Sequence, residues 1–138
     1  WERRMTGVVV TGAEFDSRRR ALGLSISETA AFCAEVEATT VNRWINGRAS
    51  VPPEALGKLD MLEEFMRMAV GRRVEITADE TMSGPVRVHR YRTQEALSAS
   101  DDAIGIPLGG HEMMTVWLVE KLAGLGITSE VVWANEDH

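Results

Sequence analysis

In the first fifty positions of the chain, apolar residues recur at helical spacing in short segments that polar residues separate. Phe15 and Leu22 lie seven positions apart, on one face of a predicted helix that ends at Gly23. The segments Thr11–Glu14 and Ser25–Glu28 both have the spacing of a capping box, in which a hydroxyl and a carboxylate satisfy free amides at a helix start. The pattern therefore predicts two short helices, one beginning at each segment.

A third helix is predicted after a turn around Val36. Val41, Trp44 and Ile45 recur at helical spacing, which indicates one buried face. The pair 46–47, Asn-Gly, ends this helix, because both residue types tolerate the left-handed conformation found after a helix.

A longer helix is predicted to begin at Pro53, because the amide that proline lacks would have no partner in a first helical turn. Its apolar stripe is Leu56, Leu59, Leu62, Met66 and Ala69. The pattern leaves the end of this helix open. Gly71 could stop it, it could run on through the arginine pair 72–73, and residues 74–76 could equally form a strand.

The rest of the chain mixes predicted strands and helices. Residues 86–91 alternate apolar and polar side chains, as in a half-buried strand, and Thr93 caps a short helix. Residues 103–108 form a short apolar strand or a turn. The glycine pair 109–110 precedes an amphipathic helix, and residues 131–133 form a last short strand.

The first three predicted helices have the chemistry of a helix-turn-helix. In that motif the second helix approaches the third closely, so the small Ala30 suits their crossing, while Val41 and Trp44 hold the third helix inward. The helical period then turns a polar set outward, as candidate base-reading residues. These are Thr39, Thr40, Asn42, Arg43 and Asn46. Arginine pairs with guanine, asparagine with adenine, and threonine offers a hydroxyl or a methyl group to a base.

Contacts to DNA phosphates are expected on either side of this reading helix. Ser25 and Ser27 offer amides and hydroxyls at the start of the second helix, and Arg48 and Ser50 lie where the chain leaves the third. The arginines at 18–20 are spaced about 100° apart on a helix, so at most one or two can face DNA. We assign Arg19 as that contact, with a solvated face as the equal alternative.

These elements predict an α+β fold in three parts. Residues 1–10 form an N-terminal arm that is disordered or partly introduced by cloning, since translation cannot start at Trp1 and Met5 can serve as a native start. Residues 11–71 form the all-α helix-turn-helix domain with the long linking helix, and residues 72–138 form a small α/β part that dimerises.

Composition narrows the class of protein. With 138 residues, 44% apolar and 26% charged, the chain can bury a core without a disulfide or a metal. The single Cys33 excludes an internal disulfide and fits a reducing cytoplasm, and the three histidines are too far apart in sequence for a metal site. No apolar run approaches the roughly 18 residues of a membrane span. We expect a cytoplasmic protein with no cofactor and no membrane contact.

The net charge of −6 argues against a simple basic nucleic-acid binder, but the charge is unevenly distributed. Residues 1–53 hold seven basic against six acidic residues, whereas residues 54–138 hold eight against fifteen. This asymmetry is compatible with a polyanion-binding module followed by an acidic one, with an uneven solvated surface as the alternative.

The same residues resemble those of a known family. The matching positions, in order, are Arg19, Ala21, Leu22, Gly23, Leu24, Ser25, Ser27, Glu28, Ala30, Val41, Trp44, Gly47 and Arg48. Over residues 13–53 the chain is similar to the lambda-repressor/Cro (Xre) class of helix-turn-helix regulators. It departs from that class in a turn one residue longer before the third helix and in Ile45, where a glutamate is usual. Glu37 replaces the usual Ser or Thr cap; its carboxylate can still cap, but it brings negative charge towards DNA.

The longer turn and the segment 44–52 resemble a narrower group, the YdiL-like regulators. That group includes anti-CRISPR-associated repressors carried by phages and mobile elements. The matching residues are Trp44, Gly47, Arg48, Val51 and Pro52. The resemblance implies a long helix followed by a small α/β part that dimerises.

Several residues have a structural alternative to a chemical role. Trp44 could stack on a base and Cys33 could sense redox state, but their apolar surroundings favour the core for both. His111 beside Glu112 could indicate catalysis, but no nucleophile, second base or metal set accompanies it, which favours a solvated helix start. The apolar side chains of the last helix exceed what one face of a small monomer buries, and we assign them to a dimer interface. They are Met113, Met114, Trp117 and Leu118, with Val116 beside them.

The sequence thus predicts a sequence-specific DNA-binding transcriptional regulator and not an enzyme. We expect a homodimeric repressor or autorepressor that reads an inverted-repeat operator in double-stranded DNA through residues 38–46. The alternative is an antitoxin-like protein whose C-terminal part binds another protein. Binding of RNA or of a partner protein stays open.

Overall fold

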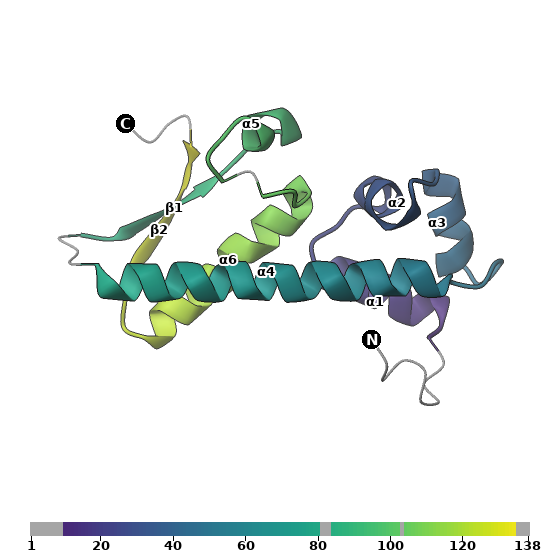
Figure 1. The fold of residues 1–138 in the computed structure, drawn as a ribbon, viewed down its shortest axis with the longest axis horizontal. Coiled ribbons are helices and arrows are strands. Elements are labelled where there is room, and N and C mark those ends of the chain that lie inside the picture. Colours follow the sequence, from purple (N-terminus) through teal and green to yellow (C-terminus); the bar gives the residue numbers. More distant parts are fainter. Residues whose placement is uncertain (1–9, 81–83, 103, 135–138) are drawn as a thin grey trace. The chain divides into compact units, whose positions relative to one another are not determined.

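Helices and one short parallel sheet make up the fold (Figure 1). The computed structural model describes residues 10–80, 84–102 and 104–134. Its elements are α1 (Gly12–Ala21), α2 (Ile26–Ala34), α3 (Ala38–Ile45), α4 (Pro53–Asp79), β1 (Val86–Arg90), α5 (Gln94–Ser98), α6 (Leu108–Gly124) and β2 (Ser129–Trp133). This is the mixed α+β layout predicted from the sequence.

The chain divides into two compact units. The first ends at Glu64 and the second begins at Phe65, so the division falls inside α4, whereas the sequence pattern suggested a boundary after residue 71. The first unit holds α1, α2, α3 and the start of α4. The second holds the rest of α4 with the sheet, α5 and α6.

Local side-chain caps explain where the first two helices begin. The hydroxyl of Thr11 accepts a hydrogen bond of 3.1 Å from the amide of Glu14. At α2 the capping box is complete, because the hydroxyl of Ser25 accepts from the amide of Glu28 while the Glu28 carboxylate accepts from the amide of Ser25. Both predicted caps are confirmed, and α1 is followed by Gly23 in the left-handed conformation, with φ of 79°.

The turn between α2 and α3 depends on Glu35, which has a φ of 51°. This left-handed conformation is unfavourable for a residue with a side chain, because its Cβ crowds the carbonyl oxygen that follows. The amide of Val36 donates to the carbonyl oxygen of Ala30 and closes the end of α2. The turn therefore contains one residue in a strained conformation, Glu35, in the segment where the sequence predicted a longer turn.

The core of the first unit forms around the inner face of α3. Phe15, Val41 and Trp44 are buried, and the rings of Phe15 and Trp44 meet edge to face with their centres 5.7 Å apart. Ala30 and Cys33 of α2 are buried in the same unit. Burial raises the pKa of the Cys33 thiol to about 11, so this cysteine is a protonated core residue, as the apolar pattern favoured.

The first turn of α1 lies against the last turn of α3 at Gly12. A Cβ atom at this position would lie 2.6 Å from the carbonyl oxygen of Ile45 and would overlap the carbonyl oxygen of Trp44. Only a residue without a side chain allows the two backbones to approach this closely. The sequence pattern did not indicate this requirement, because Gly12 reads there as an ordinary residue of a first helical turn.

Helix α4 does not stop at Gly71, which was one of the ends that the sequence left open. It begins at Pro53, as predicted, and continues to Asp79, so residues 74–76 are helical and not a strand. Val70 is buried in the core of the second unit, and Val74, one helical turn later, packs against the same core. Burial of this helical stripe decides the ambiguity in favour of a helix.

The second unit is built on a β-α-β arrangement. Strands β1 and β2 pair in parallel, with Val86 opposite Ser129 and Arg90 opposite Trp133. Parallel strands cannot be joined by a tight turn, and here α5 and α6 form the connection, with α6 lying against both strands (Figure 1). The core consists of Val70, Val86, Val88, Leu118 and Leu122.

Helix α6 begins earlier than predicted. It starts at Leu108 and includes the glycine pair 109–110 that was expected to precede it. The side-chain oxygen of Gln94 accepts a hydrogen bond of 2.8 Å from the amide of Leu108. This cap comes from α5, so the residues next to the helix did not reveal it. Residue 103 lies outside the described residues, and residues 104–107 form no strand.

None of the helices in the described ranges combines the length and the apolar composition needed to cross a membrane.

Candidate nucleic-acid interface

Helix α3 has one buried and one polar face. Val41 and Trp44 are buried, whereas Thr39, Asn42, Arg43 and Asn46 are exposed and Thr40 is half-buried. The structure therefore places four of the five candidate base-reading residues on one side of α3 and the fifth, Asn46, at its C-cap. The motif-core residues Ala30, Val41 and Trp44 lie in the interior, and at 4% exposure Trp44 is a core residue that cannot stack on a base without leaving its contact with Phe15.

The charge on this face is set by two arginines. Within the described part of the first unit, Arg43 and Arg48 are the basic residues whose side chains make no hydrogen bond, ion pair or ring contact. Arg18 is paired with Glu14 and Asp60, and Lys58 lies over the ring of Phe32. The cationic side chains without a contact in this part of the protein therefore lie in α3 and just after it, whereas the other cations already make contacts.

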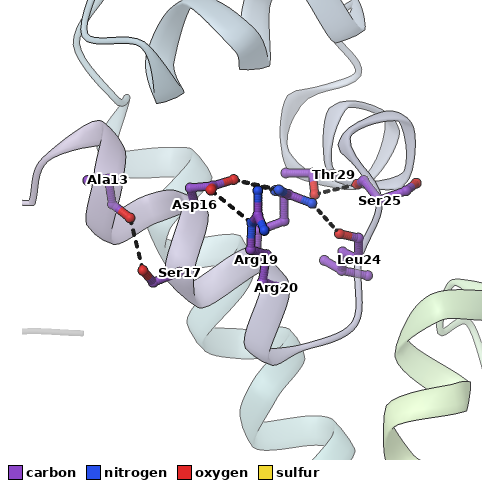
Figure 2. Close-up of polar contacts among 8 residues, drawn as sticks. All are labelled: Ala13, Asp16, Ser17, Arg19, Arg20, Leu24, Ser25 and Thr29. Atoms are coloured by element: carbon purple, nitrogen blue, oxygen red, sulfur yellow. Dashed lines mark hydrogen bonds and ion pairs between the residues drawn. The ribbon is translucent and has the colours of Figure 1, made fainter.

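Arg19 requires a correction. It is only 7% exposed, and its guanidinium donates to the carboxylate of Asp16 and to the carbonyl oxygen of Leu24, the latter at 2.7 Å (Figure 2). Arg20 donates to the other oxygen of the same carboxylate. These bonds hold the pKa of Asp16 below its usual value, because the charged carboxylate is stabilised by the hydrogen bond from Arg19 and by its positive charge. Arg19 therefore fixes the end of α1, and we replace its predicted phosphate role by this structural one.

The predicted phosphate contacts at α2 are only partly available. The amide of Ser25 is occupied by the Glu28 carboxylate, so the free amide expected at Ser25 is absent, although its exposed hydroxyl can still donate. Ser27 is exposed. Beyond α3, Gly47 has a φ of 75°, and the amide of Arg48 donates to the carbonyl oxygen of Arg43. This turn leaves Arg48 and Ser50 exposed just past α3.

The polar outer face of α3 could be predicted from the sequence, but the pairing of Asp16 with two arginines was not predicted. Asp16 decides which arginines remain unpaired, because it binds both Arg19 and Arg20. The only signal in the sequence is its spacing of three and four residues from these arginines on one helix.

Comparison with protein-family models and with curated proteins finds no match for this chain. The likeness to Xre and YdiL-like regulators therefore rests on the residues quoted for it.

The N-terminus of α3 is uncapped. Glu37 occupies the N-cap position with extended backbone, but its carboxylate makes no capping hydrogen bond, contrary to the possibility considered from the sequence. The free amides and an exposed negative charge thus coincide at the end of the helix that carries the candidate reading residues.

We expect Glu37→Ser to stabilise the protein by about 1 kcal/mol, because a serine hydroxyl at an N-cap accepts a bond from a free amide. The same change should tighten binding to DNA of any sequence, since it removes a negative charge beside the candidate base-reading residues. Thermal melts and binding to random duplex measure the two effects. Glu54→Ser, which removes an exposed charge from the first turn of α4, is the control and should not raise the melting temperature. An unchanged melting temperature for Glu37→Ser would contradict the N-cap assignment.

In the second unit, most of the residues predicted to form a dimer interface make contacts within the chain itself. Leu118 is buried at 8% exposure, and Met114 and Trp117 pack against the same core. The guanidinium of Arg67 lies 4.6 Å from the centre of the Trp117 ring. Met113 is half-buried. The assignment of Leu118 to a dimer interface is therefore wrong, because the sheet and α4 provide the apolar surface that its helix needs.

Proposed function

We propose that the protein is a sequence-specific DNA-binding transcriptional regulator that reads DNA with the outer face of α3. The observation that supports this most directly is the combination on one surface of exposed asparagine, threonine and arginine side chains with the unpaired cations Arg43 and Arg48. Asparagine and arginine recognise base edges, and unpaired cations attract the phosphate backbone. The other cations described in the first unit are neutralised or engaged, so charge and hydrogen-bonding capacity coincide on this one surface.

The positions of the two arginines support different proposed roles. Arg43 lies within α3, one helical turn from Thr39, where its guanidinium can reach a base edge. Arg48 lies beyond the end of α3, after the left-handed Gly47, where the chain would pass the sugar-phosphate backbone. Phosphate contacts position a protein on DNA, whereas base contacts specify the sequence.

The test begins with selection of bound sequences from random duplexes. We expect Arg43→Ala to weaken binding to the selected operator by about 1–3 kcal/mol and to abolish the preference at one base pair of each half-site. Arg48→Ala should weaken operator and random DNA alike and reduce the salt dependence by about one unit of slope. Arg20→Ala is the matched control, because its exposed side chain is already paired with Asp16 and should have little effect. Equal specificity profiles for Arg43→Ala and Arg48→Ala would contradict this placement of α3.

We further propose that the regulator acts as a homodimer on an inverted repeat. A single α3 reads only a few base pairs, and two copies add their binding free energies. With Leu118 buried, the apolar side chains still exposed in the second unit include a stripe along α4, formed by Phe65, Met68 and Ile76 on one helical face. We propose this stripe as the dimer surface in place of the one first assigned from the sequence.

Light scattering at micromolar concentration should therefore give the mass of a dimer. The double variant Phe65→Glu/Met68→Glu should be monomeric and bind the operator more weakly, because both positions are exposed in the protomer and would place charge in the interface. A double variant at exposed polar positions outside this stripe, Glu95→Gln on α5 and Lys121→Gln on α6, should remain dimeric. A monomeric wild-type protein would rule out the dimer.

A further inference from the structure

The second unit has a cavity of about 200 Å³, open to solvent on the side of the exposed Arg73, Arg87 and Ile104, that the proposed DNA-binding surface does not use. Its walls come from α4, β1 and α6 and from residues 101, 102 and 104. A dry apolar cavity of about 150 Å³ is enough to admit benzene. The space here therefore fits a small organic molecule rather than a nucleotide or a peptide.

The lining of this cavity is amphipathic. Val70, Val88 and Leu118 belong to the buried core and supply apolar surface. Charged side chains from three elements line the same space, and they include Arg73 and Arg87. Such a combination of apolar contact area with a few polar groups is typical of small-molecule sites.

His111 provides the second observation. It lines the cavity, it is only 8% exposed, and its Nδ1 atom is buried with no hydrogen-bond partner among the residues that the structure describes. The sequence favoured a solvated position for this histidine, and that prediction is wrong, because its ring packs edge to face on Tyr91 at 5.5 Å. A buried polar atom without a partner costs free energy, and a hydrogen-bonding ligand in the cavity would relieve that cost once the ring turns towards it.

The ionisation of His111 is compatible with such a role. Burial is the largest effect and lowers the pKa of the imidazole. The charges of Asp102 and Glu112 raise this pKa, and the charge of Arg90 lowers it further. At neutral pH the ring is therefore uncharged and offers one donor and one acceptor.

Arg73 is the group in the cavity wall that favours an anionic ligand. Among the described residues, Arg73 has no ion pair or hydrogen bond to its side chain, whereas Asp102 is engaged at 2.6 Å by the hydroxyl of Tyr91. Arginine binds carboxylates through charge-assisted hydrogen bonds. Asp101 and Asp102 repel a doubly charged phosphate more strongly than a singly charged carboxylate, so a carboxylate fits this lining better.

We propose that this cavity binds a small carboxylic acid with an apolar body, its carboxylate at Arg73, its body against Val70, Val88 and Leu118, and a hydrogen bond to His111. This site lies in the second unit and does not depend on DNA binding by α3.

The experiment titrates the full chain with phenylacetate, isovalerate, phenylacetamide and inorganic phosphate, followed by amide NMR. At least one carboxylate should bind saturably, with shifts confined to the second unit around the cavity. The neutral amide should bind about tenfold more weakly or worse, because it lacks the charge that Arg73 recognises. Arg73→Gln should lower carboxylate affinity by about tenfold, while Arg72→Gln, its exposed neighbour on α4 outside the cavity, should bind like the wild type.

Four results would overturn this site. The first is the absence of saturable shifts with both carboxylates, which would leave the space to water. The others are equal binding of the amide, binding of phosphate as tight as that of the carboxylates, and equal behaviour of Arg72→Gln and Arg73→Gln. Circular dichroism shows whether the variants remain folded, which is expected because both arginines are exposed.

Discussion

Trp44→Ala is expected to lower the free energy of unfolding by about 3–5 kcal/mol and to unfold or loosen the first unit. The indole is 4% exposed and forms an edge-to-face contact with Phe15. Such a contact contributes about 0.5–1.5 kcal/mol beyond the burial of apolar area. Since a domain of this size is stable by only about 5–15 kcal/mol, the loss is a large share of the total.

Thermal melts followed by far-ultraviolet circular dichroism measure this loss. Arg43→Ala is the matched control, because it removes a large side chain from the exposed face of the same helix and should leave the melting temperature nearly unchanged. If Trp44→Ala melted like the wild type and lost only DNA binding, Trp44 would be a reading residue and not part of the core.

Gly12→Ala is the second substitution with a large expected effect, a loss of about 3 kcal/mol. The added Cβ would overlap the carbonyl oxygens of Trp44 and Ile45, which are backbone atoms and cannot rotate away. Helix α1 would have to move from the end of α3. We therefore also expect weaker operator binding, since α3 would lose the support that fixes its outer face.

Gly57→Ala is the control, and its expected effect has the opposite sign. Gly57 lies inside α4, and a Cβ there would meet nothing within 4 Å. Alanine should therefore stabilise the helix by about 0.5–1 kcal/mol, because glycine loses more conformational freedom on folding. Chemical denaturation of both variants provides the comparison. Equal stabilisation by the two substitutions would show that α1 and α3 do not approach each other at Gly12.

Features that depend on neighbours in the sequence could be predicted from it. The caps at Thr11 and Ser25 were predictable because their partners lie three residues away. The two faces of α3 were predictable because helical periodicity alone places Val41 and Trp44 opposite Asn42 and Arg43. The proline that starts α4 belongs to the same class, since its preference for a first helical turn is local.

Features that depend on distant partners could not be predicted in this way. The cap on α6 comes from Gln94, and the burial of His111 follows from its contact with Tyr91, each from a different element. The sequence also left the end of α4 open, because a run such as residues 74–76 is compatible with a helix or a strand until a core forms around it.

By itself, then, the sequence determined the positions of the short N-terminal helices and the polar outer face of α3, because these follow from spacing within a few residues. The tertiary structure decided which polar groups on those helices remain available. Arg19 is withdrawn from solvent by Asp16 and by the carbonyl oxygen of Leu24, while Arg43 and Arg48 stay unpaired. It also decided that Leu118 lies in a core rather than at an interface. The physical reason is the same in each case, because burial and pairing depend on which elements meet in space, and a local pattern does not specify that.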